Sequence, residues 1–229
     1  MLTSSPATSH RLGCAAVLLD MDGVLVDSTK SLESCLRAWA ADRDLDPDQV
    51  VAESRGRPDL ELVRRVAPHL NPELEAREIA AREARNIAGV RPIDGARQLL
   101  ESLPVRQWAV VTSASGAGAR ARLAAAGIAQ PAVLVTCEDV VAGKPEPECY
   151  LTAARRLGVS PKDCVVFEDA PFGTIAGIAA GVGAVIGVAG TVLPNELIDA
   201  GVFCVIPDLT CVRAVKAGRG MELVISRSA

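Results

Sequence analysis

Carboxylates are paired at two places in the sequence, each time directly after a short apolar run. Asp20 and Asp22 follow the first run, and Glu168 and Asp169 follow a later one. Residues two apart in a strand share a face, so Asp20 and Asp22 would crowd one small space. Neighbouring like charges are costly unless a proton or a cation intervenes. A hard divalent cation with oxygen ligands would relieve that repulsion, and magnesium is the usual ion where phosphate is also bound.

Further polar features after apolar runs point to an anionic ligand. Gly23 lets the backbone turn sharply after the first acidic pair and presents bare N–H groups to an anion. Ser113 and Ala114 offer a hydroxyl and backbone amides at the entrance of a helix, which is a natural phosphate site. Lys144 lies between a glycine and a proline. Taken singly, these are an acidic turn, a helix cap and a surface lysine; together they place complementary groups on one rim of one sheet.

A scaffold for these residues follows from the apolar runs, which suit strands buried on both faces of a parallel sheet. Stretches rich in Ala or Leu, with helical spacing, lie between most of the runs. This alternation predicts an α/β fold with a doubly wound parallel sheet and right-handed crossovers, which binds ligands at the carboxyl ends of its strands. The predicted strands are 14–21, 108–112, 132–137, 164–167, 184–188 and 203–206, and the predicted helices include 118–126, 148–157 and 172–180.

The segment 29–90 breaks the alternation, because it contains no convincing strand and is dense in charged residues. Four prolines divide it into several helices, since proline is tolerated at helix starts and disrupts helix interiors. Asn71 and Pro72 form a good start signal, with Asn71 as the N-cap. We predict an all-helical cap domain at 29–90, inserted into a core made of 1–28 and 91–229. The alternative is that these helices merely extend the core.

Composition excludes several classes of protein. The 229 residues are 49% apolar with a formal net charge of −4, which gives no broad attraction for nucleic acid or an anionic membrane. No stretch approaches the ~20 consecutive apolar residues that a membrane span needs. Seven scattered cysteines without a CxxC motif read as reduced structural thiols, which places the protein in the cytoplasm. We expect residues 1–12 to be a frayed tail and not a secretory signal, and 221–226 to be an edge strand or a loose end.

Four segments in the order found here resemble the motifs of the haloacid dehalogenase superfamily of phosphohydrolases, over about residues 15–205. DMDGVLVDS resembles the nucleophile motif, VVTSAS the phosphate-hydroxyl motif, GKPEPECY the lysine motif and FEDAPFGTIAGIAAG the acidic motif. Helices inserted between the first two motifs resemble the subgroup of β-phosphoglucomutase and small sugar or polyol phosphatases. The resemblance implies a Rossmann-like core sheet with a helical cap, and hydrolysis of a phosphate monoester.

The same resemblance implies a role for each matched residue. Asp20 would be the nucleophile that becomes an aspartyl-phosphate. Asp22 would be the general acid for the departing alkoxide and then the general base for water. Ser113 and Lys144 would hold the non-bridging phosphate oxygens, and Lys144 would restrain Asp20.

The resemblance also implies a magnesium site. The ion would lie between Asp20, the backbone carbonyl of Asp22, and Asp169, with Glu168 close by directly or through water. Cation, lysine and amides together would stabilise charge on the transferring phosphoryl group.

The sequence specifies the reaction and the substrate less narrowly than it specifies the site residues. The mutase carries a histidine where this chain has Leu32, and no histidine occurs between Arg11 and Pro68, so hydrolysis is favoured over the mutase alternative. Gly56 and Arg57 are candidate substrate contacts in the cap, against the alternative of an exposed loop. The resemblance implies a small sugar or polyol phosphate as the substrate, and it does not choose between hexose, polyol and glycerol phosphates.

Two non-enzymatic alternatives and the assembly state complete the predictions. A signalling receiver domain also phosphorylates an aspartate, but on a middle strand and without a large helical insertion. A catalytically silent phosphate-binding relative is disfavoured by the intact set of acids, hydroxyl and lysine. We expect a small-molecule phosphate ester as the partner, no nucleic acid and no membrane, and a monomer or a dimer.

Overall fold

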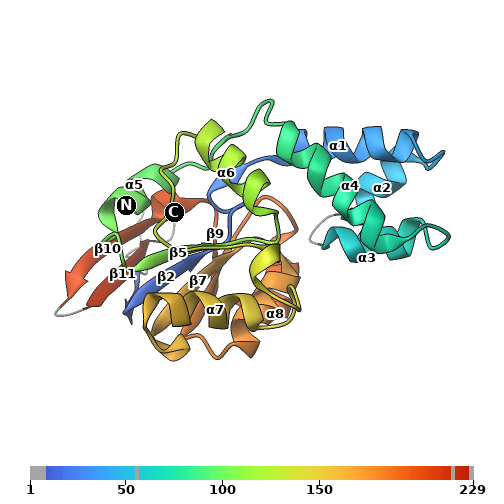
Figure 1. The fold of residues 1–229 in the computed structure, drawn as a ribbon. Helices are drawn as coiled ribbons and strands as arrows, with labels where there is room; N and C mark the ends of the chain where they lie inside the picture. Colours follow the sequence, from blue (N-terminus) through green and yellow to red (C-terminus); the bar gives the residue numbers. More distant parts are fainter. Residues whose placement is uncertain (1–8, 55–56, 218–219, 227–229) are drawn as a thin grey trace, which may run out of the picture.

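A six-stranded parallel sheet forms the centre of the protein in a computed structural model that describes residues 9–54, 57–217 and 220–226. The strand order is β6-β5-β2-β7-β8-β9 (Figure 1), and every neighbouring pair is parallel. The predicted doubly wound α/β fold is therefore confirmed. The strands are β2 (Ala16–Leu19), β5 (Trp108–Val111), β6 (Leu134–Val135), β7 (Cys164–Glu168), β8 (Ala184–Val188) and β9 (Cys204–Ile206).

Strand β2 lies in the middle of this sheet because both of its faces are apolar. Val17 and Leu19 pack into one cluster, and Ala16 and Leu18 pack into another on the opposite face. The chain proceeds from β2 to β5 and β6 on one side, then returns to place β7 on the other side of β2. Crossovers that diverge from one strand leave a crevice at its carboxyl end, which is where such sheets bind ligands.

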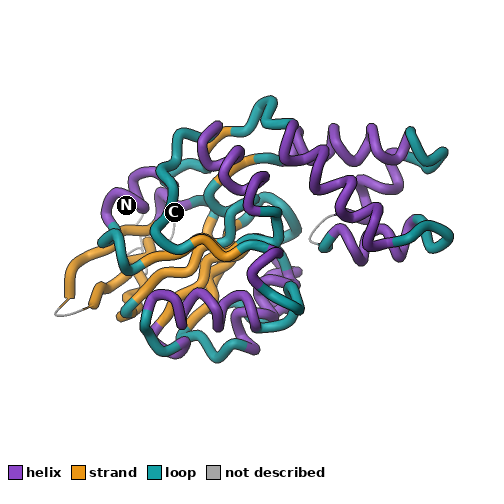
Figure 2. Tube along the Cα trace, viewed as in Figure 1, coloured by secondary structure: helices purple, strands orange, loops and turns teal. Residues whose placement is uncertain are grey.

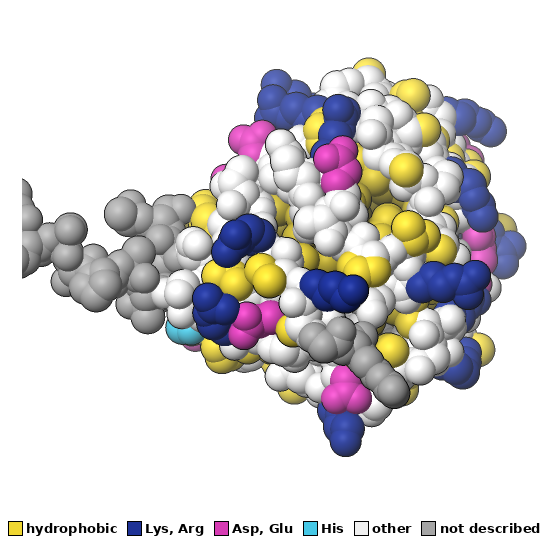
Figure 3. Space-filling model, turned by 90° about the vertical axis from the view of Figure 1, so that its left-hand side faces the viewer, with side chains coloured by type: hydrophobic (Ala, Val, Ile, Leu, Met, Phe, Trp, Pro, Cys, Tyr) yellow, Lys and Arg dark blue, Asp and Glu magenta, His cyan; other side chains and the backbone are white. Residues whose placement is uncertain are grey.

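Helices cover both faces of the sheet (Figure 1). Helices α5 (Ala96–Ser102) and α6 (Gly116–Ala125) lie on one face, and α7 (Glu148–Leu157) and α8 (Pro171–Ala179) lie on the other. A last helix, α9 (Pro194–Ala200), packs beside α8. Within the described ranges, no helix is long and apolar enough to cross a membrane. Basic and acidic side chains are interspersed on the face in Figure 3.

Four helices are inserted after the first strand of the parallel sheet, as predicted, and project away from it (Figures 1 and 2). They are α1 (Thr29–Ala41), α2 (Pro47–Ser54), α3 (Asp59–Val66) and α4 (Pro72–Arg85). They share a separate apolar cluster built around the fully buried Trp39. The Asn71 side chain accepts a hydrogen bond from the Leu74 amide at 3.0 Å, as expected of an N-cap. The boundaries 29 and 90 of a separate domain stay a proposal.

Two short strands join the insertion to the core. Strand β3 (Val26–Asp27) enters it, strand β4 (Arg91–Pro92) leaves it, and the two pair antiparallel. Arg91 also donates to Asp27 at 2.8 Å across this pair. The entry and exit of the insertion are thus held side by side, so its helices approach the sheet from one place.

The two ends of the described chain pair with each other, which corrects the predicted frayed tail for residues 9–12, while residues 1–8 of that prediction lie outside the described residues. Strand β1 (Ser9–Cys14) pairs antiparallel with β11 (Gly220–Ser226), which also pairs with β10 (Val212–Ala217). The prediction for 221–226 was also wrong, because β11 is the middle strand of this sheet. Met221, Leu223 and Ile225 of β11 alternate into the main core, and that burial stabilises a strand whose partner lies some 200 residues away in sequence. Cys14, expected to open the first buried strand, belongs to β1.

Candidate active site

Asp20 is buried at the carboxyl end of β2, where the crossovers of the parallel sheet diverge. Its backbone amide donates to the Phe167 carbonyl of β7 at 3.0 Å, which extends the strand pairing up to this residue. The residue is only 7% exposed. Burial raises the pKa of the Asp20 carboxyl well above its usual value, while the Lys144 charge acts in the opposite direction.

Lys144 is the cation that faces Asp20. Its ammonium donates to Asp20 Oδ1 at 2.5 Å and to Glu168 Oε1 at 2.6 Å, and to the Val111 carbonyl at 3.3 Å. Burial alone would lower the pKa of Lys144, but the carboxylates of Asp20 and Glu168 hold that pKa above its ordinary value. The lysine therefore stays charged beside the first aspartate, at the end of strands that are far apart in sequence.

Three buried carboxylates meet around one position. Oxygen atoms of Asp20, Glu168 and Asp169 all lie within 4.8 Å of one another. Burial, followed by the charge of Glu168, raises the pKa of Asp169 to about 7. Three acids with one lysine leave an excess of negative charge in a buried space, and oxygen ligands of this kind fit a hard divalent cation.

The other atoms of these acids are held by groups of the core. Tyr150 donates its hydroxyl to Glu168 Oε1 at 2.5 Å, and the Asp169 amide donates to Glu168 Oε2 at 3.1 Å. Thr191 donates to Asp169 Oδ2. A Cβ on Gly173 would lie 1.8 Å from Glu168 Oε1, so only glycine fits beside this carboxylate. The acids are thus fixed by packing and hydrogen bonds, which is how a preorganised site is built.

The loop after β2 separates the second aspartate from this carboxylate cluster. Asp22 Oδ1 accepts from the Ser28 hydroxyl at 2.6 Å, and Oδ2 accepts from Arg122 at 2.5 Å. Gly23 has a φ of 80°, and a Cβ there would lie 1.8 Å from Asp169 Oδ2. Gly23 therefore serves both the turn and the close approach of Asp169. Its amide donates to the Val26 carbonyl at 2.8 Å, so the prediction of a bare N–H at this residue is wrong.

Ser113 lies two residues beyond the end of β5 and is exposed. The helix that follows is capped by Ser115, whose hydroxyl accepts from the Gly118 amide at 3.2 Å. The Ala114 amide donates to the Thr112 hydroxyl at 3.1 Å. Capping is thus carried out by a different serine, and the Ser113 hydroxyl is left on the rim of the sheet with Ala114.

Comparison with known proteins identifies the family to which this chain belongs. A family model described as haloacid dehalogenase-like hydrolase matches residues 14–181. The chain belongs to the haloacid dehalogenase-like hydrolases. Hexitol phosphatase A of Escherichia coli is 40% identical over 177 residues, which cover 73% of this chain and 80% of that protein. The 2-deoxyglucose-6-phosphate phosphatase 1 of Saccharomyces cerevisiae is 34% identical over 87% of this chain and 89% of its own length.

Solved structures agree with the architecture of this haloacid dehalogenase-like hydrolase. A hydrolase from Pseudomonas syringae superposes with a TM-score of 0.74 at 24% identity, over 85% of this chain and 93% of the other, which shows the fold. A putative β-phosphoglucomutase from Bacteroides vulgatus gives a TM-score of 0.70 at 30% identity, over 86% and 85% of the two chains. The core sheet with inserted helices is therefore the architecture of the family, and a receiver domain is excluded.

The structure gives little information on the two substrate contacts predicted in the inserted helices of this haloacid dehalogenase-like hydrolase. Gly56 lies outside the described residues. Arg57 is half-buried, and its Nε donates to the Glu53 carbonyl at 3.0 Å, so part of the side chain is used within the insertion. A contact of Gly56 or Arg57 with substrate stays a prediction.

Several residues of the site were not found by sequence reasoning. Tyr150, Thr191 and Gly173 act on the acids through contacts that no local pattern shows, although Tyr150 falls within the lysine motif and Gly173 within the acidic motif. Ser28 lies at the end of the first motif, so its hydrogen bond to Asp22 is the contact that the sequence could most easily have indicated. The residues missed are Ser28, Glu83, Arg122, Tyr150, Gly173 and Thr191.

Proposed function

We propose that this chain is a magnesium-dependent phosphatase that hydrolyses small sugar or polyol phosphate monoesters through an aspartyl-phosphate at Asp20. The observation that carries the proposal is the buried contact of Lys144 with Asp20 at the carboxyl end of β2, beside Glu168 and Asp169. The identity to hexitol phosphatase A and to two 2-deoxyglucose-6-phosphate phosphatases supports this substrate class. Glycerol-1-phosphate phosphohydrolase 2 of Saccharomyces cerevisiae, at 34% identity, supports the polyol range.

The roles that we propose for these side chains give the following reaction. An Asp20 carboxylate oxygen attacks phosphorus, the bond from phosphorus to the ester oxygen breaks, and Asp22 gives a proton to the departing alkoxide. Asp22 then accepts a proton from water as the water oxygen attacks the aspartyl-phosphate, which releases inorganic phosphate and restores Asp20. Lys144 and Ser113 hold the non-bridging oxygens, and Lys144 keeps Asp20 oriented.

Magnesium is the cofactor that we propose for the acidic cluster. Asp20, Asp169 and the backbone carbonyl of Asp22 would hold the ion, with Glu168 beside them. The fit rests on three buried carboxylates whose oxygens lie within 4.8 Å of one another, accompanied by one lysine. When bound, the cation neutralises charge on the phosphoryl group.

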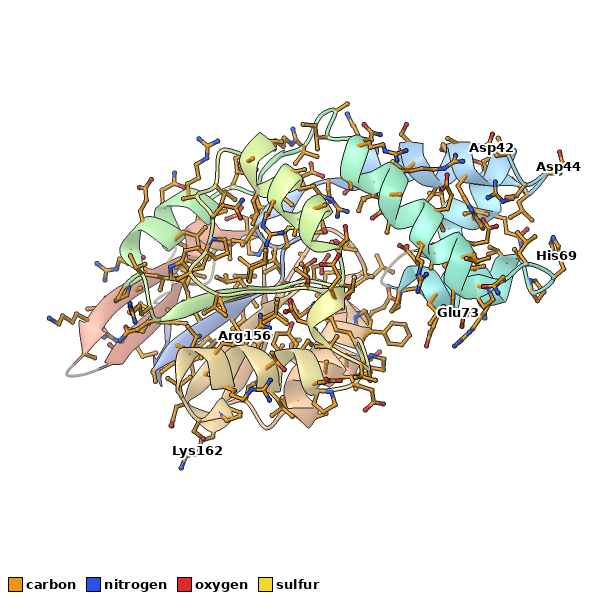
Figure 4. All side chains as sticks on the ribbon, in the orientation of Figure 1. Asp42, Asp44, His69, Glu73, Arg156 and Lys162 are labelled. Atoms are coloured by element: carbon orange, nitrogen blue, oxygen red, sulfur yellow. The ribbon has the colours of Figure 1, made fainter. Side chains whose placement is uncertain are left out.

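A sugar-phosphate mutase of the β-phosphoglucomutase type is the second candidate, and the residues of this chain disfavour it. Leu32 on α1 occupies the position where the mutase carries a histidine. Of the two histidines in the chain, His10 lies in β1 with its ring edge-on to Phe203, and His69 lies at the outer end of the insertion (Figure 4). Hydrolysis is therefore the reaction that these side chains support.

A panel of phosphate esters tests the proposed function. The purified protein, supplied with magnesium, is incubated with a hexitol phosphate, 2-deoxyglucose 6-phosphate, glycerol 1-phosphate, fructose 1-phosphate and a hexose 1-phosphate, and released phosphate is measured. We expect release from at least one sugar or polyol phosphate with a kcat in the usual enzymatic range of about 1–10³ s⁻¹. Absence of release across the panel would indicate a silent binder, and conversion of the hexose 1-phosphate to its isomer without release would indicate the mutase.

Removal of divalent cations should stop this activity reversibly. The three acids of the cluster repel one another when they are all ionised, so the phosphate ester, which is also an anion, should bind and react poorly without a cation. We expect chelation to lower phosphate release by at least about 10²-fold and added magnesium to restore it. Release that continues undiminished in chelator would remove the metal from the proposal.

The compartment and assembly state are also proposals. We place the protein in the cytoplasm, since cysteines such as Cys149 and Cys164 are buried among apolar side chains as small hydrophobes. We propose a monomer or a dimer that acts on a small phosphate ester without nucleic acid or membrane.

A further inference from the structure

The single tyrosine of the chain lies against the buried lysine of the site. Tyr150 on α7 is fully buried, and its hydroxyl donates to Glu168 Oε1 at 2.5 Å. The Lys144 ammonium lies over the same ring, 5.4 Å from its centroid. Burial, followed by the charge of Glu168, raises the pKa of the Tyr150 hydroxyl well above its ordinary value, so the phenol keeps its proton and acts as a donor.

The loop before Lys144 is fastened to the helix that carries Tyr150. Glu148, in the first turn of α7, accepts hydrogen bonds from the amides of Val141 and Ala142 at 3.0 and 2.9 Å. The loop and the helix therefore form one unit, and this unit keeps the tyrosine in place beside the lysine.

The Lys144 ammonium already has three hydrogen-bond acceptors. It donates to Asp20 Oδ1 at 2.5 Å, to Glu168 Oε1 at 2.6 Å and to the Val111 carbonyl at 3.3 Å. An ammonium has three N–H donors in total. Lys144 must therefore weaken or release one of these contacts before it can donate to a phosphoryl oxygen.

Glu168 is the acceptor that competes with the phosphoryl group for this ammonium. A carboxylate holds an ammonium more strongly than a neutral carbonyl does, and Asp20 itself becomes the phosphorylated group in the proposed reaction. Glu168 is 1% exposed, and a buried carboxylate oxygen that is left without a donor is costly. Oε1 therefore needs a second donor if Lys144 is to leave it, and the Tyr150 hydroxyl supplies one.

We propose that Tyr150 is a positioning residue whose hydroxyl stays on Glu168 Oε1 when Lys144 turns to the phosphoryl group, and so lowers the barrier to that exchange. Tyr150 acts through Lys144 and Glu168, and it needs no contact with the substrate. This inference rests on the proposed phosphatase function, and it adds a residue that controls how readily the lysine is delivered to the phosphoryl oxygens.

Tyr150→Phe keeps the ring and removes only the hydroxyl, so it isolates this role. We expect kcat for the preferred ester of the panel, at saturating magnesium, to fall by about 10- to 100-fold, as for the loss of a hydrogen bond to a charged group. KM should change by less than about 3-fold, because the exchange accompanies transfer of the phosphoryl group. Thr152→Val removes a hydroxyl from another buried residue of α7, and it should leave kcat near wild type.

Biosynthetic incorporation of 3-fluorotyrosine labels Tyr150 alone, because the chain has a single tyrosine. Fluorine makes the phenol a stronger donor and leaves the hydroxyl in place, so we expect kcat to stay within about 3-fold of the unlabelled protein. The label also gives a single fluorine NMR resonance. Adding inorganic phosphate to the labelled protein with magnesium present should shift this resonance, because Lys144 then leaves Glu168 Oε1 to the Tyr150 hydroxyl.

Several outcomes would overturn the inference. A wild-type kcat in Tyr150→Phe would show that the hydroxyl is not needed. An equal loss of kcat in the fluorotyrosine protein, or in Thr152→Val, would assign the effect to packing and not to hydrogen-bond donation. A fluorine resonance that stays unchanged while inorganic phosphate inhibits turnover competitively would show that Lys144 does not exchange. A wild-type protein inactive on every ester would refute the proposed function itself, whereas any of these results in an active protein refutes the inference alone.

Discussion

Replacing Asp20 by Asn should lower kcat by at least about 10⁴-fold, in line with the loss of a catalytic nucleophile. Asparagine has nearly the shape of aspartate, but its amide oxygen is a poor nucleophile, so the aspartyl-phosphate cannot form. Phosphate release from the preferred ester in the panel, measured with magnesium present, checks this prediction. Asp199→Asn, which changes an exposed carboxylate on α9, is the matched control and should retain wild-type kcat.

The fold should survive this replacement, so the loss can be assigned to chemistry. Asp20 is buried beside Glu168 and Asp169, both of which raise its pKa, and Lys144 keeps its contact with Glu168 when Asp20 is neutral. We therefore expect the free energy of unfolding, measured in chelator, to stay within about 1 kcal/mol of wild type or to rise. Substantial phosphatase activity in a folded Asp20→Asn variant would assign the nucleophile elsewhere.

Replacing Lys144 by Met should damage both stability and catalysis. The ammonium is the cation between Asp20 and Glu168, and its removal leaves buried carboxylates without that partner. Breaking a buried pair in this way costs about 3–5 kcal/mol, which we expect as the loss in free energy of unfolding in chelator at mildly alkaline pH. We also expect kcat to fall by at least about 10²-fold, because a preorganised donor to the phosphoryl oxygens is lost.

Two comparisons verify the cause of the Lys144→Met effect. Lys162→Met, at an exposed lysine on the surface (Figure 4), should change neither quantity. Added magnesium should restore more stability to Lys144→Met than to wild type, because the cation then offsets the unpaired acids. A Lys144→Met protein as stable in chelator as wild type would contradict the electrostatic account of the site.

The meeting of Asp20, Glu168 and Asp169 was predictable because each of these residues follows an apolar run, whereas Lys144 lies in a loop beyond β6 and was assigned through its motif. A run buried on both faces reads as a parallel strand, and parallel strands bring their carboxyl ends to one edge. Local rules were also sufficient for the Asn71 cap, which depends on neighbouring residues alone. Residues that are positioned by the end of a strand or by the end of a helix could therefore be predicted from the sequence.

Contacts between residues that are far apart in the sequence could not be predicted from the sequence. Arg120 and Arg122 look alike in an Ala-rich helix, yet the first is exposed and the second is buried against Asp22 and Glu83. Only the placement of α4 on α6 distinguishes them. The pairing of β1 with β11 has the same origin, because β11 has a local partner in β10 but β1 finds its partner only at the other end of the chain.

Trapping the covalent intermediate tests the central claim most directly. The protein is mixed with its preferred phosphate ester, quenched during turnover and treated with borohydride, which reduces an acyl phosphate to an alcohol and so converts a phosphorylated aspartate to homoserine. Peptide mass spectrometry then locates the modified residue. We predict homoserine at position 20 only, in a yield that depends on substrate. Modification at Asp22 or Asp169, or complete turnover with no modified aspartate at all, would contradict the assignment of Asp20 as the nucleophile.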